Sequence, residues 1–181
     1  MPELSAPTAA VATSFVAAMR EFAAEGRGGP DDDTMVGADI RQWQRRWDTP
    51  EGFAAYVAAL CAQSDERAPR PAGWVPSTTW WWVDGPAYLG RIALRHRLTS
   101  RLRERGGHIG YDVRPTARRQ GHATAMLRAV LPRAHDLGID PALVTCDTGN
   151  LASRKVILAS GGMLEDELHG VLRFWVPTHQ P

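Results

Sequence analysis

The stretch Tyr111–Ala123 constrains this chain more than any other part of its sequence. A β-type run ends at a proline, the chain turns, and a helical pattern begins at Gly121. Small residues at positions 121 and 123 let a ligand approach the backbone closely, and the free N–H groups and positive end of the helix face that ligand. We therefore predict a pyrophosphate-binding helix start, to which Arg118 and Arg119 add positive charge.

Hydrophobic periodicity predicts three N-terminal helices and then a mixture of strands and helices. Helices are predicted over 8–25, 39–47, 50–63, 98–105, 119–135 and 150–160, and strands over 78–83, 88–94, 108–114, 142–146, 163–168 and 171–176. Strand–helix–strand units imply parallel neighbours, whereas the hairpins imply antiparallel ones. The expected fold is therefore α/β, with a mixed sheet and helices on its faces.

Two motifs in the right order resemble a known family. Arg118–Ala123 matches the pattern Arg/Gln-x-x-Gly-x-Gly/Ala, and Asn150 begins a helix just after a strand, with Gly161 following 11 residues later. Both are similar to the coenzyme-A-binding motifs of the GNAT (GCN5-related N-acetyltransferase) family, within which the chain resembles a group of bacterial predicted acetyltransferases. The resemblance covers about residues 75–176 and implies the GNAT fold, a mostly antiparallel central sheet with helices on both faces.

The resemblance also implies a cosubstrate and a domain plan. The cosubstrate is acetyl-CoA, and no metal is expected. The chain is expected to be a single acetyltransferase domain over 1–181, in which 1–74 forms a helical acceptor-side segment and 75–181 the acetyl-CoA-binding core. The residues expected to contact acetyl-CoA are Val113, Arg118, Arg119, Gln120, Gly121, His122, Ala123, Thr124, Asn150 and Ser153.

The family's chemistry is direct transfer, in which a base deprotonates the amine and an acid protonates the departing thiolate. Candidates for the base are His108 and Asp112, which alternate onto one face of a strand. Many relatives have a tyrosine acid seven residues after the motif asparagine, but here that position is Ile157. Ser153 is the remaining candidate for the acid, although it can equally be a small residue that packs under the coenzyme. The general base and general acid therefore stay open.

The acceptor side is predicted from an uneven distribution of charge. Residues 1–66 carry 11 acidic and 5 basic side chains, whereas the remainder carries 9 acidic and 16 basic side chains. An acidic cleft bordered by aromatic rings suits a cationic amine or aminosugar, although solvated faces and core packing explain the same residues. The candidate acceptor-binding residues are Asp31, Asp32, Asp33, Asp39, Trp80 and Trp82.

Three functions are compatible with these motifs. The first is N-acetylation of a small-molecule primary amine, for which resistance to an aminoglycoside-like antibiotic is one specific case. The second is acetylation of a protein N-terminus or lysine, which needs an open peptide groove. The third is a non-catalytic acyl-CoA-binding regulatory domain, which the missing tyrosine alone supports. The acceptor amine and the oligomeric state stay open, although a homodimer would be in keeping with the family.

Composition excludes several other classes of protein. The net charge of +1 argues against a nucleic-acid partner, despite the arginines between 91 and 105. No apolar run approaches the roughly 18 residues that span a bilayer, so no membrane partner is expected. No signal peptide is visible, and Cys61 and Cys146 lack metal-type spacing and are expected to be buried thiols. A cytoplasmic location follows as an expectation.

Overall fold

The computed structural model describes residues 1–179 and has a seven-stranded sheet in the order β1-β2-β3-β4-β5-β7-β6. Only β4 and β5 pair in parallel among the described strands, and the other neighbours are antiparallel. This arrangement confirms the predicted mixed, mostly antiparallel sheet. The strands are β1 (Glu3–Ser5), β2 (Ser77–Asp84), β3 (Ala87–Arg95), β4 (Ile109–Val113), β5 (Ala142–Asp147), β6 (Met163–Leu168) and β7 (Val171–Val176).

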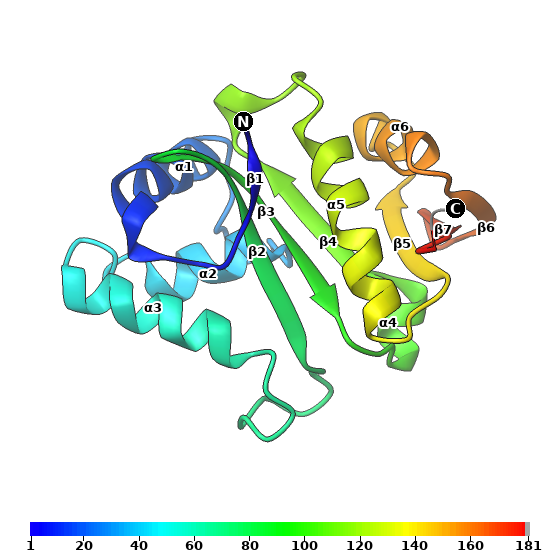
Figure 1. Cartoon of the computed structure of the whole chain (residues 1–181), viewed down its shortest axis with the longest axis horizontal. Coiled ribbons are helices and arrows are strands. Elements are labelled where there is room, and N and C mark those ends of the chain that lie inside the picture. The colour runs from blue at the N-terminus through cyan, green and yellow to red at the C-terminus, as the bar shows by residue number, and fades with distance from the viewer. Residues whose placement is uncertain (180–181) are drawn as a thin grey trace.

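Helices cover both faces of this sheet (Figure 1). On one face, α1–α3 enclose a core of aromatic rings around Phe15 and Trp81. On the other face, α5 and α6 pack over Ile92, Val144 and Phe174. The helices are α1 (Ala12–Ala24), α2 (Met35–Trp43), α3 (Pro50–Ala62), α4 (Ser100–Glu104), α5 (His122–Asp136) and α6 (Leu151–Ala159), with 3-10 turns η1 (Ala9–Val11) and η2 (Pro115–Ala117).

Local signals explain most helix boundaries. The Thr49 hydroxyl accepts the Gly52 N–H at 3.1 Å and Pro50 opens α3, as the sequence predicts. By contrast, α2 begins at Met35, four residues before the predicted start, because the Thr34 hydroxyl caps the helix. The glycine at 37 obscured this start, since glycine has low helix propensity.

Two further expectations differ from the structure. β1 was not predicted, because three residues are too few to carry a periodic pattern. It is held by pairing with β2 and by packing of Leu4 against the core on the α5 side. Cys61 is exposed on α3, so the prediction that it is buried was wrong, whereas Cys146 is buried as predicted. In the described part of the chain, every helix is too short or too polar to cross a membrane.

Candidate active site

The parallel strands β4 and β5 diverge along their length. Within residues 1–179 their pairing is limited to Ile109 and Val144, although β4 continues to Val113. Beyond that pair, one edge of β4 therefore has no neighbouring strand. Unpaired strand edges present free peptide groups that can bind a ligand.

Two amides of β4 point toward this open edge. The other edge of β4 is hydrogen-bonded to β3. Just after β4, the Arg114 N–H continues this pattern and donates to the Leu89 carbonyl at 2.9 Å. Peptide groups alternate along a strand, so the N–H groups of Tyr111 and Val113 face away from β3. They are therefore oriented toward the gap between β4 and β5.

The turn that follows β4 carries a row of free amides. After η2, Arg119 and Gly121 adopt left-handed backbone angles, with φ of 66° and 83°. Gly121 is the N-cap of α5. Within residues 1–179, the N–H groups of 119–124 have no hydrogen-bond partner, so they and the positive end of α5 form a cradle for an anion. This cradle fits the diphosphate of coenzyme A.

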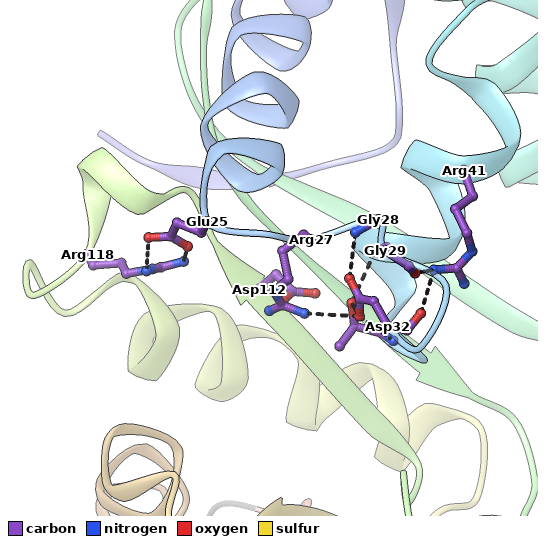
Figure 2. Close-up of polar contacts among 10 residues, drawn as sticks. Glu25, Arg27, Gly28, Gly29, Asp32, Arg41, Asp112 and Arg118 are labelled. Atoms are coloured by element: carbon purple, nitrogen blue, oxygen red, sulfur yellow. Dashed lines mark hydrogen bonds and ion pairs between the residues drawn. The ribbon is translucent and has the colours of Figure 1, made fainter.

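The arginines of this turn bind α1. Arg118 makes a two-pronged ion pair with Glu25, with N–O distances of 2.8 and 2.7 Å (Figure 2). Arg114 donates two hydrogen bonds, at 2.8 and 2.6 Å, to a single oxygen of Glu21, and Thr116 donates two to the other oxygen. Burial opposes ionisation of Glu21, but the bonds from Arg114 and Thr116 lower its pKa overall. The C-terminal end of α1 is thereby fixed to the turn.

Asp112 lies on the face of β4 that α1 and α2 cover. Its carboxylate accepts a hydrogen bond from Arg27 at 3.0 Å, and Arg27 comes from the loop between α1 and α2 (Figure 2). Burial raises the pKa of Asp112, and the positive charge of Arg27 opposes that rise. A carboxylate with a raised pKa is suited to accept a proton near neutral pH.

Asp32 fixes the loop that carries Arg27. Its carboxylate accepts hydrogen bonds from the Gly28 N–H at 2.8 Å and the Thr34 hydroxyl at 2.6 Å, and lies 3.7 Å from Arg27. Burial tends to raise the pKa of Asp32, but these bonds lower it overall. Asp32 therefore stays ionised and holds the loop over β4.

Asp39 belongs to a deeper ion pair. It accepts hydrogen bonds from Arg91 and from the Tyr56 hydroxyl, the latter at 2.8 Å. Arg91 is 3% exposed and stands opposite Asp112 in the β3–β4 register. Burial opposes the charge of Arg91, yet Asp39 raises the pKa of Arg91 well above its ordinary value. Arg27 and Arg91 thus face Asp32, Asp39 and Asp112, and the Arg95 side chain lies on the same face beside Gly110.

The structure places His108 between β4 and β5 rather than at an open surface. It is 8% exposed, and its Nδ1 accepts the Leu143 N–H at 2.9 Å. Burial and nearby arginines lower its pKa to about 4. His108 precedes β4 rather than lying within it, and its Nδ1 lone pair is already engaged.

Ser153 and Asn150 lie together at the start of α6. The Asn150 side chain accepts the Ser153 N–H at 3.0 Å and caps the helix. The Ser153 hydroxyl lies 2.7 Å from the hydroxyl of Tyr111. Ile157 is fully buried, so it contributes packing to the core.

The remaining candidates are divided between the two faces of the sheet. Trp80 and Trp82 pack on the α5 side, where the Trp82 indole N–H donates to His122 Nδ1 at 3.2 Å. They are therefore not brought together with the acidic residues under α1 and α2. Asp31 and Asp33 are exposed on the loop. The rest of the turn, Gln120, Ala123 and Thr124, lies beside Gly121 as predicted.

Five residues of this region were missed by sequence reasoning: Glu21, Glu25, Arg27, Arg91 and Tyr111. One available signal was the pair Glu21 and Glu25 near the C-terminal end of α1. Acidic side chains are unfavourable beside the negative end of a helix, so their presence indicates nearby cations. In the part of the chain that the structure describes, no cluster of three His, Cys, Asp or Glu could hold a metal ion.

Comparisons with known proteins agree with this geometry. Residues 31–163 match the family model described as an acetyltransferase (GNAT) domain. A comparison with curated protein sequences finds no match.

Several solved structures share the fold. Mycobacterium smegmatis RimJ in complex with CoA-disulfide is 16% identical with a TM-score of 0.65, covering 97% of this chain and 81% of that one. The ribosomal-protein-S5-alanine acetyltransferase of Vibrio fischeri is 12% identical with a TM-score of 0.64, covering 98% of this chain and 93% of that one. The microcin C7 self-immunity acetyltransferase MccE, in complex with acetyl-CoA and AMP, is 12% identical with a TM-score of 0.60, covering 97% and 92%.

Proposed function

Because the chain belongs to the GNAT acetyltransferase family and is an acetyl-CoA-dependent N-acetyltransferase, we propose that its acceptor is a primary amine of a small cationic molecule. Direct transfer of the acetyl group is the proposed reaction. The observation that carries the proposal is the Arg27–Asp112 ion pair, which seats a cation against β4 beside the open edge. An aminoglycoside-like aminosugar or a polyamine has the charge that such a site would select.

Acetyl-CoA supplies an activated acetyl thioester, and the chain's own residues would bind it in two places. The free amides of 119–124 would hold the diphosphate, aided by Arg118, Arg119 and the helix dipole. Asn150 would contact the pantetheine arm from the start of α6. The remaining predicted contacts, Val113, Gln120, His122, Ala123, Thr124 and Ser153, line the same strand end and helix starts.

The open edge of β4 would stabilise the reacting carbonyl. The N–H groups of Tyr111 and Val113 point toward β5 and are able to donate to a developing oxyanion. Since β4 is held by β3 on its other edge, these donors are fixed before the substrate arrives.

Asp112 is the base that this geometry favours. Its pKa is raised by burial, and its carboxylate faces the acceptor side. Binding of a cationic acceptor would draw Asp112 away from Arg27, after which the carboxylate would take a proton from the ammonium group. His108 is less suited to this role, because its Nδ1 accepts a backbone N–H and its pKa is lowered to about 4.

A protein acceptor is the second candidate. One structural neighbour is by its own description a ribosomal-protein acetyltransferase, but at 12% identity that likeness concerns the fold. The loop between α1 and α2 is held over Asp112 by hydrogen bonds to Asp112 and Asp32. It limits the space for an acceptor there, which favours a small molecule.

The test is thiol release from acetyl-CoA with aminosugars, polyamines and peptides bearing free N-termini. Turnover with a polyamine or aminosugar, but not with peptides, is expected. Turnover with peptides alone would contradict the small-molecule proposal, and binding of acetyl-CoA without turnover would support the regulatory alternative.

A further inference from the structure

Side chains from three elements meet where β4 and β5 diverge. Tyr111 comes from β4, Cys146 from β5 and Ser153 from the first turn of α6. The Tyr111 and Ser153 hydroxyl oxygens are 2.7 Å apart. Burial raises the pKa of the Cys146 thiol, and a hydrogen bond from Ser153 opposes that rise. The Ser153 hydroxyl is therefore in hydrogen-bond contact with the Tyr111 phenol.

Hydrogen bonds fix both the backbone and the side chain of Ser153. Its backbone N–H is held by the Asn150 side chain at 3.0 Å, and its hydroxyl by Tyr111. One turn later, α6 presents Ile157, which is fully buried and has no polar atom in its side chain. Tyr111 thus brings a phenol from β4 to the start of α6. Its own backbone N–H faces the open edge of β4.

We infer that Tyr111 is a positioning residue that directs the Ser153 hydroxyl toward the sulfur of coenzyme A. This inference rests on the proposed transfer from acetyl-CoA. A serine hydroxyl has one hydrogen and two acceptor lone pairs. If Tyr111 donates to Ser153 Oγ, the Ser153 hydrogen remains free for a sulfur acceptor. In the complex, the coenzyme sulfur would accept that hydrogen.

The direction of the Tyr111–Ser153 bond is part of the inference. A phenol is intrinsically a more acidic hydroxyl than that of serine, so Tyr111 is assigned as the donor and Ser153 Oγ as the acceptor. A chain of two hydrogen bonds polarises its members, which strengthens the bond that Ser153 donates. Bonds to a charged acceptor are also roughly twice as strong as neutral ones. The bond from Ser153 therefore strengthens as negative charge develops on sulfur.

The transfer step balances without any further reactant. The amine nitrogen forms a bond to the acetyl carbon, the carbon–sulfur bond breaks, and its electron pair passes to sulfur. Ser153 keeps its proton and donates a hydrogen bond to the thiolate. The proton lost by the amine passes to the base and then through solvent to the thiolate, which yields the coenzyme thiol.

The test is the pKa of the coenzyme A thiol when bound to the protein, measured from ultraviolet thiolate absorbance during a pH titration. A parallel titration with desulpho-coenzyme A provides the blank, so that titration of the protein is subtracted. The exposed Cys61 is replaced by serine throughout. This readout needs no acceptor amine. The variants are Tyr111→Phe, Ser153→Ala and the double variant, each checked for coenzyme binding by calorimetry.

A hydrogen bond to a charged group contributes about 1.5 kcal/mol or more, which corresponds to about one pKa unit. Ser153→Ala is expected to raise the pKa of the bound thiol by about one unit, and Tyr111→Phe by about 10–30% of that shift. The double variant should match Ser153→Ala, because Tyr111 acts through Ser153. The matched control is Tyr88→Phe, since the buried Tyr88 hydroxyl has no partner within residues 1–179.

An unchanged thiol pKa in Tyr111→Phe and Ser153→Ala, with coenzyme A still bound, would overturn this inference alone. A shift of equal size in Tyr88→Phe would overturn it too, because it would indicate a general effect on packing. Failure of the unsubstituted protein to bind coenzyme A would overturn the proposed function and this inference together.

Discussion

The coenzyme side and the acceptor side of this site are built by different means. On the coenzyme side, the backbone amides of 119–124 and the start of α5 make the cradle. On the acceptor side, an ion pair joins the loop after α1 to β4, as in Arg27–Asp112 (Figure 2). Backbone sites depend on a short local motif, whereas side-chain sites depend on residues far apart in sequence. A backbone site can therefore be recognised from sequence, whereas a side-chain site can be recognised only once the fold is known.

The largest expected effect on coenzyme affinity comes from Gly121, where the coenzyme approaches the backbone. Gly121→Val places a branched side chain at φ 83°, where an added Cβ meets no protein atom within 4 Å. Left-handed backbone costs such a residue about 1–2 kcal/mol, and the side chain would also block the amides. We expect the Kd for coenzyme A, measured by calorimetry, to rise about a hundredfold, which is roughly 2.7 kcal/mol.

The matched control for that variant is Gly138→Val. Gly138 has φ of 74° and equally open surroundings, but it lies beyond the opposite end of α5. It should show the same strain in a thermal melt with coenzyme affinity unchanged. Equal losses of affinity in the two variants would indicate that strain, and not the cradle, explains the effect.

The acceptor side is tested by Asp112→Asn, which keeps the shape of the side chain and removes the base. General-base catalysis contributes about 10²–10⁴-fold, so kcat/KM for the amine should fall within that range while the Kd for coenzyme A stays the same. Asp136→Asn, on exposed α5 surface, is the control. A loss in coenzyme affinity equal to the loss in kcat/KM would show that the two sides are not separable.

Arg27→Met tests the ion pair that spans the acceptor side. Asp112 already has a pKa above its ordinary value of 3.8, so the folded state binds its proton more tightly than the unfolded state. The free energy of unfolding therefore falls as the pH rises through the raised pKa of Asp112, and the positive charge of Arg27 limits that fall. The variant should lose more Tm, relative to the unsubstituted protein, at about pH 7.5 than at about pH 4.5. An equal loss at both values would mean that Asp112 is not the group involved.

The smallest effect is expected for Glu25→Gln, which releases Arg118 toward the diphosphate. The pair is 41% exposed on both sides, and such pairs contribute about 0.2–1 kcal/mol. Coenzyme affinity should therefore rise by about two- to threefold. The control is Glu66→Gln, which frees Arg97 from another exposed ion pair and should leave coenzyme affinity unchanged. A fall in affinity on Glu25→Gln would show that Glu25 positions Arg118 rather than competing for it.

The sequence predicted the parts of this fold that are local. The proline at the end of β4, Gly121 and the Asn150 cap each act within a few residues, and all three lie where the motif placed them. β1 could not be predicted, because its three residues gain stability from tertiary contacts, namely pairing with β2 and packing of Leu4 against the core. The early start of α2 depends on the Thr34 cap, which the glycine at 37 concealed.

The acceptor side was predicted only in outline. The acidic excess of the N-terminal third pointed to Asp32 and Asp39, but not to the arginines that pair with them. The separation of Arg27 from Asp112 is 85 residues, so no spacing rule connects them. The face of β2 on which each tryptophan lies was equally hidden, since a strand of three tryptophans presents aromatic rings to both sides.

The most direct test of the account is a crystal structure of the protein grown with acetyl-CoA. The account predicts that the diphosphate oxygens accept hydrogen bonds from the amides of 119–124 and that the thioester lies between β4 and β5. A diphosphate bound elsewhere, with this turn empty at saturating coenzyme, would contradict it.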